Sequence, residues 1–185
     1  WSVKPNAFSQ PTTLGGLAFC NAGTFAATFQ IPIITWADSS ISIWNSVLSA
    51  GPLERYPGIS PLGENGFVGA GTSIRVSLDS GKTFALVAAT PPNGSNVLTA
   101  VATAGRKIVA VGNGSTANNG IIITSLDQGK TWKNLFLGKG KFNAVAYTGA
   151  EFIAVGNAGV IVTSRDGVTW TDIPSGTTEN LLGVA

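Results

Sequence analysis

The sequence predicts an all-β fold built from consecutive four-stranded antiparallel sheets. A turn-like string of small residues, Asp, Gly and Thr with a closing aromatic occurs three times, at residues 77–84, 125–132 and 164–170. Similar apolar segments precede the strings in the same order. Runs such as 121–123 are apolar without alternation, which indicates strands buried on both faces. Such regular repetition is typical of repeat architectures.

Each repeat unit contains four predicted strands. Leu98 and Phe142 open apolar segments at residues 98–102 and 142–146, and residues 14–19 resemble them. A tight turn leads to a second strand at 107–112, 152–156 and 24–29. A third strand at 121–124 and 160–163 runs into the turn-like string, and a short fourth strand follows the closing aromatic. No stretch has the pattern of a helix.

The closing aromatics set the length of the unit. Trp1, Trp44, Phe84, Trp132 and Trp170 lie about 40 to 50 residues apart, the period of a four-stranded propeller blade. The sequence therefore predicts a β-propeller. We expect residues 1–185 to form a single propeller segment, with units at 1–44 (degenerate), 45–84, 85–132 and 133–170, and with 171–185 beginning another blade. These units amount to about four blades, which we expect to form an arc of a larger propeller or to close with another chain.

Two parts of the repeat are irregular. The second unit lacks a clear first strand, because residues 53–58 stand in its place and two nearby prolines argue against central pairing. The string of the first unit is degraded at residues 38–44. At the other end, residues 181–185 resemble a first strand without its partners.

The repeated string, called the box here, has the chemistry of a fixed turn. An Asp carboxylate accepts hydrogen bonds from backbone N–H groups that follow it, Gly supplies positive φ, and the aromatic packs between sheets. A calcium or catalytic role is weakly supported, because each box has one Asp and no further acidic residue at the spacing of a calcium loop. We predict structural roles for the box residues Ser77, Asp79, Gly81, Thr83, Phe84, Ser125, Asp127, Gly129, Thr131, Trp132, Ser164, Asp166, Gly167, Thr169 and Trp170.

The pattern S-x-D-x-G-x-T-W resembles the Asp-box, or bacterial neuraminidase repeat, of the sialidase-like propeller superfamily. The resemblance covers residues 65–185 well and 1–64 loosely. It extends to sialidases, other propeller glycosidases and photosystem II assembly factors, so it implies a fold without implying an activity. It also implies that ligands bind at the end of the propeller opposite the boxes.

Composition excludes several classes of function. The chain has no His, and its single cysteine, Cys20, allows neither an intrachain disulfide nor a cysteine-based metal site. The net charge of +2 is not clustered, which argues against nucleic-acid binding. The uncharged stretch at 14–36 contains too many polar residues for a membrane span. We expect no metal and no cofactor.

The candidate ligand face lies at the end opposite the boxes. Its candidate residues are Arg55, Tyr56, Asn113, Asn118, Asn119, Lys139, Asn157 and Glu179. The resemblance implies that a sialidase would need three arginines converging on one carboxylate. Of the four arginines, Arg106 and Arg165 fall at the box end. The acids Glu54, Glu64, Asp172 and Glu179 suggest no catalytic pair.

These observations favour a non-catalytic binding or structural scaffold with a protein or carbohydrate partner. Low charge, the absence of His and abundant Thr, Asn and Gly suit a secreted or cell-surface protein. Two alternatives stay open: a fragment of a glycoside hydrolase or sialidase-like enzyme, and an assembly factor of the photosystem II type.

Overall fold

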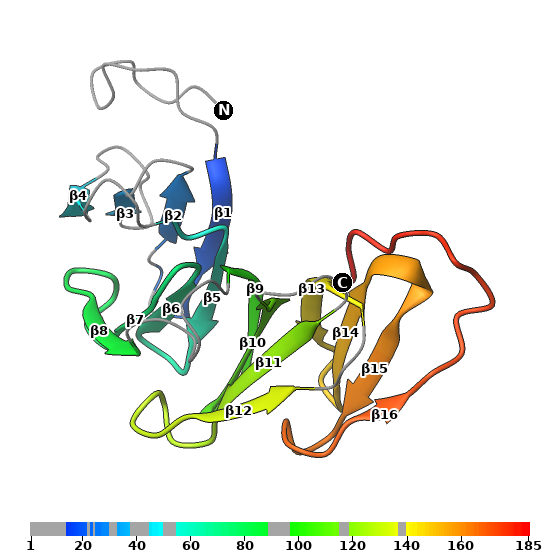
Figure 1. The fold of residues 1–185 in the computed structure, drawn as a ribbon. Coiled ribbons are helices and arrows are strands. Elements are labelled where there is room, and N and C mark those ends of the chain that lie inside the picture. Colours follow the sequence, from blue (N-terminus) through cyan, green and yellow to red (C-terminus); the bar gives the residue numbers. More distant parts are fainter. Residues whose placement is uncertain are drawn as a thin grey trace.

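The computed structural model describes residues 14–21, 23, 25–29, 33–37, 45–49, 55–88, 97–114, 119–136 and 140–185. In these residues the chain forms four separate sheets of four antiparallel strands, and the predicted all-β fold of four-stranded blades is confirmed (Figure 1). The strands are β1 (Leu14–Phe19), β2 (Phe25–Phe29), β3 (Ile33–Ala37), β4 (Asn45–Ser49), β5 (Gly58–Leu62), β6 (Gly66–Ala70), β7 (Ile74–Ser77), β8 (Ala85–Ala88), β9 (Val97–Ala104), β10 (Lys107–Asn113), β11 (Gly120–Ser125), β12 (Lys133–Phe136), β13 (Phe142–Tyr147), β14 (Phe152–Gly156), β15 (Ile161–Ser164) and β16 (Thr171–Asp172).

Each sheet is a simple meander in which every strand pairs with the next one along the chain. Tight turns join the first two strands of a sheet, and Gly105 and Gly149 adopt positive φ of 60° and 93° in two of these turns. The first strands β1, β5, β9 and β13 contact one another in succession, so the sheets lie side by side in chain order. The only helical element in the described part of the chain is a 3-10 turn, η1 (Asn157–Gly159).

The sheets end one strand later than the closing aromatics. The short strands β8, β12 and β16 follow Phe84, Trp132 and Trp170 and pair back onto the third strand of the same sheet. Residues 171–172 therefore complete the last sheet, and the described residues 173–185 contain no strand. Trp1 and residues 38–44, which include the degraded box and Trp44, lie outside the described residues.

The second sheet corrects the expectation that its first strand is lost. β5 pairs with β6 over its whole length, with Pro61 opposite Phe67. Pro61 is tolerated because β5 is the innermost strand and has only one hydrogen-bonded neighbour, so one edge of the strand needs no N–H donors. The sequence argument failed because it applied the rule for central strands to an edge strand.

The core consists of apolar layers between neighbouring sheets. In β11, Ile121 and Ile123 pack toward the β5–β8 sheet, whereas Ile122 packs toward the β13–β16 sheet. All six residues of β11 are buried, which confirms the prediction of burial on both faces. Cys20 is a free thiol, 1% exposed, in the layer between the first two sheets.

Candidate partner-binding site at the loop end

The sheets have two chemically different ends. One end, the box end, carries the box turns together with the turns between first and second strands. The backbone N–H of Ser80 donates to the carbonyl of Asn65 at 2.7 Å, and that of Gln128 donates to Arg106 at 2.9 Å. These bonds tie each of the two longer boxes to the first turn of its own sheet. The opposite end, called the loop end, carries the turns between second and third strands and the connectors between sheets.

The two longer boxes have the same hydrogen-bond network. The Ser125 hydroxyl donates to Asp127 Oδ1 at 2.8 Å and accepts from the backbone N–H of Gly129 at 2.8 Å. The N–H and the hydroxyl of Thr131 donate to the two carboxylate oxygens of Asp127, at 2.8 and 2.6 Å. The box at 77–84 repeats these four bonds at 2.6 to 2.9 Å. Both carboxylate oxygens are engaged within the turn.

The third box is one residue shorter but has a similar network of hydrogen bonds around its Asp. The Ser164 hydroxyl donates to Asp166 Oδ1 at 2.9 Å and accepts from Gly167 N–H at 2.8 Å. Asp166 also accepts from the backbone N–H groups of Val168 and Thr169, at 2.8 and 2.7 Å. The shortening removes the residue that adopts positive φ before Gly in the other boxes, Ser80 and Gln128, each at 62°.

These hydrogen bonds stabilise the charged form of each box carboxylate. The hydroxyl and backbone N–H of Thr131 lower the pKa of Asp127 from 3.8 to about 2. The backbone N–H groups of Thr169 and Val168 hold the pKa of Asp166 well below its usual range. Desolvation raises the pKa of Asp79, but its hydrogen bonds, with Thr83 first among the donors and Ser77 next, leave that pKa below its usual value.

The closing aromatics lie in the layers between sheets. Phe84 is buried in the layer between the first and second sheets, and Trp132 and Trp170 pack against the next two layers. The Trp132 indole N–H donates to its own box carbonyl, Gly129, at 2.9 Å. In contrast, the buried Trp170 indole N–H has no hydrogen-bond partner in the described part of the chain.

Arg55 and Tyr56 are both candidates for the ligand face at the loop end, but the structure exposes one and buries the other. Arg55 is exposed, and its backbone is tied to Thr72 by hydrogen bonds of 3.0 and 3.2 Å. Tyr56 is 1% exposed, and its hydroxyl lies 2.7 Å from both Ser73 Oγ and Arg75 Nε. Tyr56 therefore belongs to the core, because the apolar ring is covered and its polar tip finds partners inside.

The described asparagines of the predicted face, Asn113, Asn119 and Asn157, lie at the turns between second and third strands. Asn113 ends β10 with its side-chain oxygen buried and without a hydrogen-bond partner among the described residues, and the Asn119 carbonyl accepts from Gly114 N–H at 2.6 Å. Asn157 accepts from Asn143 Nδ2 at 2.9 Å. Asn118 and Lys139 lie outside the described residues.

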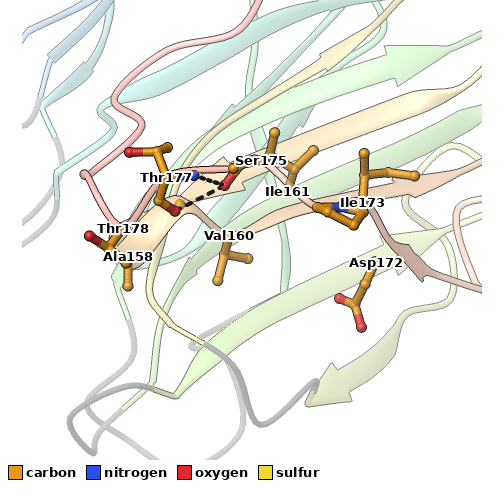
Figure 2. Close-up of a pocket in the computed structure, with 11 residues that line it drawn as sticks. Ala158, Val160, Ile161, Asp172, Ile173, Ser175, Thr177 and Thr178 are labelled. Carbon is orange, nitrogen blue, oxygen red and sulfur yellow. Dashed lines mark hydrogen bonds between the residues drawn. The ribbon is translucent and has the colours of Figure 1, made fainter.

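A hollow of about 760 Å³ lies at the loop end of the last sheet (Figure 2). It is formed by η1, the start of β15, the end of β16 and the connector that follows β16. We call it the connector hollow. Its lining residues are Ala158, Gly159, Val160, Ile161, Asp172, Ile173, Pro174, Ser175, Gly176, Thr177 and Thr178.

Backbone hydrogen bonds hold the connector over η1. Gly159 N–H donates to the carbonyl of Glu179 at 2.7 Å, and Ala158 N–H donates to the Asn180 side chain at 3.0 Å. Ser175 forms a local turn with the backbone of Thr177, drawn with dashed lines in Figure 2. Glu179 thus contributes its backbone to the connector, while its side chain is exposed.

Sequence reasoning identified Asn157 and Glu179 at this end but missed the hollow between them. The only signal is the string 174–178, Pro-Ser-Gly-Thr-Thr, which is a typical loop composition and does not indicate a cavity. Ala158, at φ 56°, also gave no signal, because positive φ is uncommon for Ala. The hollow arises from the way the connector folds back over η1.

Of the described candidate acids, Asp172 lines the connector hollow and Glu179 lies in the connector, both at the loop end. Glu64 lies in the turn between β5 and β6, at the box end. Glu54 lies outside the described residues. In the described part of the chain, no three His, Cys, Asp or Glu side chains gather as metal ligands would, and no helix is long and apolar enough to cross a membrane.

Comparison with known proteins gives information at the level of the fold. No protein-family model and no curated protein sequence matches the chain. Similar solved structures include U3-55K, with a TM-score of 0.69 and 6% identity over 90% of this chain and 53% of that chain. The WD40 repeats of RRP9 have a TM-score of 0.65 and 9% identity over 80% of this chain and 44% of that chain. YCF48 bound to D1 peptide has a TM-score of 0.45 and 18% identity over 91% of this chain and 70% of that chain.

The chain thus spans about half the length of the U3-55K and RRP9 chains. At these identities the similarity concerns the fold alone, because one fold hosts many functions. The four sheets, their order and these two neighbours together establish a β-propeller fold of four-stranded antiparallel blades.

Proposed function

We propose that this chain is a non-catalytic binding module that holds an extended segment of a protein partner in the connector hollow. The observation that carries the proposal is the hollow itself, whose volume of about 760 Å³ falls within the range of ligand-binding sites. It lies at the end opposite the boxes, where the connectors leave side chains and backbone exposed. Rigid sheets carrying exposed loops are a common arrangement for binding sites.

The chemistry of the lining suits a polypeptide. Val160, Ile161 and Ile173 offer apolar contacts, and the Thr178 hydroxyl offers a hydrogen bond beside them. Among the described strands, β16 pairs only with β15, so its outer edge has no neighbouring strand. An extended segment that aligns with this edge gains main-chain hydrogen bonds, while the apolar lining receives its side chains.

A carbohydrate partner is less well supported. The lining contains no aromatic side chain on which a sugar ring could stack. Extracellular location is part of the proposal and is supported by composition alone, with 11% charged residues and no His.

A sialidase-like activity has weaker support than binding. Arg106 and Arg165 lie in turns at the box end, whereas Arg55 lies at the loop end and Arg75 is within β7. Three guanidinium groups at one carboxylate would require a different arrangement of these side chains.

Binding of random linear peptides displayed on phage tests the proposal. Ala158 lines the hollow and Ala150 lies in the β13–β14 turn at the box end; both are exposed. We expect wild-type protein to enrich peptides, Ala158→Arg to weaken their binding at least about tenfold by filling the hollow, and Ala150→Arg to leave it unchanged. Circular dichroism confirms that the variants are folded. Absence of enrichment on folded protein, or equal binding by Ala158→Arg, would refute the proposal.

A further inference from the structure

Another hollow, of about 600 Å³, lies at the box end between the second and third sheets. The turn between β7 and β8 and the start of β8 form one wall, and the turn between β11 and β12 forms the other (Figure 1). We call it the box groove. The two sheets that enclose it pack against each other through one apolar layer. Its volume falls within the range of small-molecule sites.

The wall that belongs to the second sheet is apolar. Val76 is 5% exposed, and Val87 packs against the same layer. Ala85 and Leu78 also line the groove and are exposed, and Leu78 is 62% exposed. A ligand with an apolar body would cover these side chains and remove their surface from water.

The wall that belongs to the third sheet supplies hydrogen-bond donors. Gln128 and Lys130 line the groove, and neither side chain has a hydrogen bond or an ion pair with a described residue. A Cβ on Gly63, in the β5–β6 turn, would lie 3.8 Å from Gln128 Nε2, so the Gln128 amide reaches across to the second sheet. An unpaired ammonium beside an unpaired amide suits a ligand that accepts hydrogen bonds and carries negative charge.

The acidic residue in the lining, Asp79, is already engaged. Its carboxylate accepts hydrogen bonds from the Ser77 hydroxyl at 2.8 Å and from the N–H and the hydroxyl of Thr83 at 2.9 and 2.6 Å. It therefore offers less to a cation than Lys130 offers to an anion. The charge that is available to recognise a ligand in the box groove is positive.

The two donors are not a general consequence of the repeat. The box at 164–170, which faces the third sheet in the next layer, has no residue in the place of Gln128. Val168 stands there in the place of Lys130. The layer between the third and fourth sheets therefore lacks both the amide and the ammonium.

We infer that the box groove binds a small amphipathic carboxylate, a molecule with an apolar body and one carboxylate group. The apolar body packs against Val76, Val87 and Leu78, and the carboxylate accepts hydrogen bonds from the Lys130 ammonium and the Gln128 amide. This site lies at the end of the sheets opposite the connector hollow and takes a different class of ligand.

Titration of the isotope-labelled 185-residue chain with octanoate, followed through its amide NMR spectrum, tests this inference. We expect saturable shifts at the amides of Val87, Gln128 and Lys130. Octanamide and octylamine, which keep the apolar chain and lack the carboxylate, should bind more weakly. Lys130→Gln should weaken octanoate binding about threefold, the effect of one exposed ion pair.

Lys82→Gln is the matched control. Lys82 holds the same box position in the second sheet as Lys130 in the third, and it does not line the groove. This variant should bind octanoate as the wild type does, and the NMR spectrum shows directly that each variant is folded. Equal effects of Lys82→Gln and Lys130→Gln would overturn the inference.

Ala85→Gln tests where the ligand lies. The corresponding strand position in the third sheet is Lys133, so this position accepts a long side chain. Glutamine should occupy the groove and weaken octanoate binding. Unchanged binding by the folded variant, octylamine binding as tight as octanoate binding, or no saturable shifts at millimolar octanoate would each overturn the inference. None of these results depends on peptide binding at the connector hollow.

Discussion

The hydroxyl of Thr124 donates a hydrogen bond of 2.7 Å to the carbonyl oxygen of Gly167, across the layer between the third and fourth sheets. This bond links the third strand of one sheet to the box of the next. In the preceding box the corresponding carbonyl, Gly129, accepts instead from the indole of its own Trp132. The indole N–H of Trp170, the equivalent aromatic in the fourth sheet, is buried and finds no hydrogen-bond partner among the described residues. In the shorter box, the glycine carbonyl therefore accepts a hydrogen bond from the preceding sheet, whereas in the box at 125–132 it accepts one from the tryptophan of the same box.

Replacing Thr124 by Val tests the contribution of this bond. Val has nearly the same side-chain shape as Thr, and the second sheet already has a Val, Val76, at the equivalent position. The substitution removes the hydroxyl that donates to the Gly167 carbonyl. We expect a loss of about 1–2 kcal/mol in the free energy of unfolding, measured by urea denaturation of dilute protein.

Thr163→Val is the matched control, because Thr163 occupies the same strand position without this hydrogen bond. It should change the free energy of unfolding by less than about 0.5 kcal/mol in dilute protein. Equal effects of the two substitutions would show that the Thr124 bond contributes nothing of its own.

The box carboxylates predict a dependence of stability on acid. The pKa of Asp127 is about 2 in the folded chain against 3.8 ordinarily, and the pKa values of Asp79 and Asp166 are also lowered. The unfolded chain therefore binds more protons between these values, so the stability from these groups is complete above about pH 4 and is lost as the pH falls toward 2. Thermal unfolding from pH 5 to pH 2 should show a falling melting temperature.

The triple variant Asp79→Asn, Asp127→Asn, Asp166→Asn isolates this effect. It should be less stable than wild type at pH 5 and should lose less stability on acidification, because three of the titrating groups are gone. Parallel pH profiles of the variant and the wild type would contradict the assignment of the effect to the boxes.

The packing around Gly156, at the loop end, leaves no room for a side chain. A Cβ on this residue would lie 2.0 Å from the carbonyl oxygen of Lys141, and Gly112 shows the same close approach, 2.2 Å from the carbonyl of Val97. We expect Gly156→Ala to cost about 1–3 kcal/mol in the free energy of unfolding, because backbone must shift to admit the methyl group. Gly183→Ala, which meets no atom within 4 Å, is the control and should be neutral. If Gly156→Ala left the free energy of unfolding unchanged, the backbone around Lys141 would have to move aside at little cost.

The fold was predictable because its causes are local and repeated. The runs at 121–123 and 152–156 contain too little polar alternation for a one-sided sheet, and the boxes mark the turn after each third strand. The prediction failed at β5, where Pro61 is acceptable on an inner edge, and at Tyr56, whose burial depends on Ser73 and Arg75. Both errors concern which neighbours a residue meets, and the sequence does not state that.

The sequence by itself determined most of the strands, their order and the positions of the boxes at 77–84, 125–132 and 164–170, because hydrophobic pattern and turn chemistry act over a few residues. Only the tertiary structure decided where the connector 173–181 folds, and so created the connector hollow. Only the structure distinguished Thr124, which meets the next sheet, from Thr163, which does not. These differences arise because contacts between sheets depend on three-dimensional packing and cannot be read from residues that are neighbours in the chain.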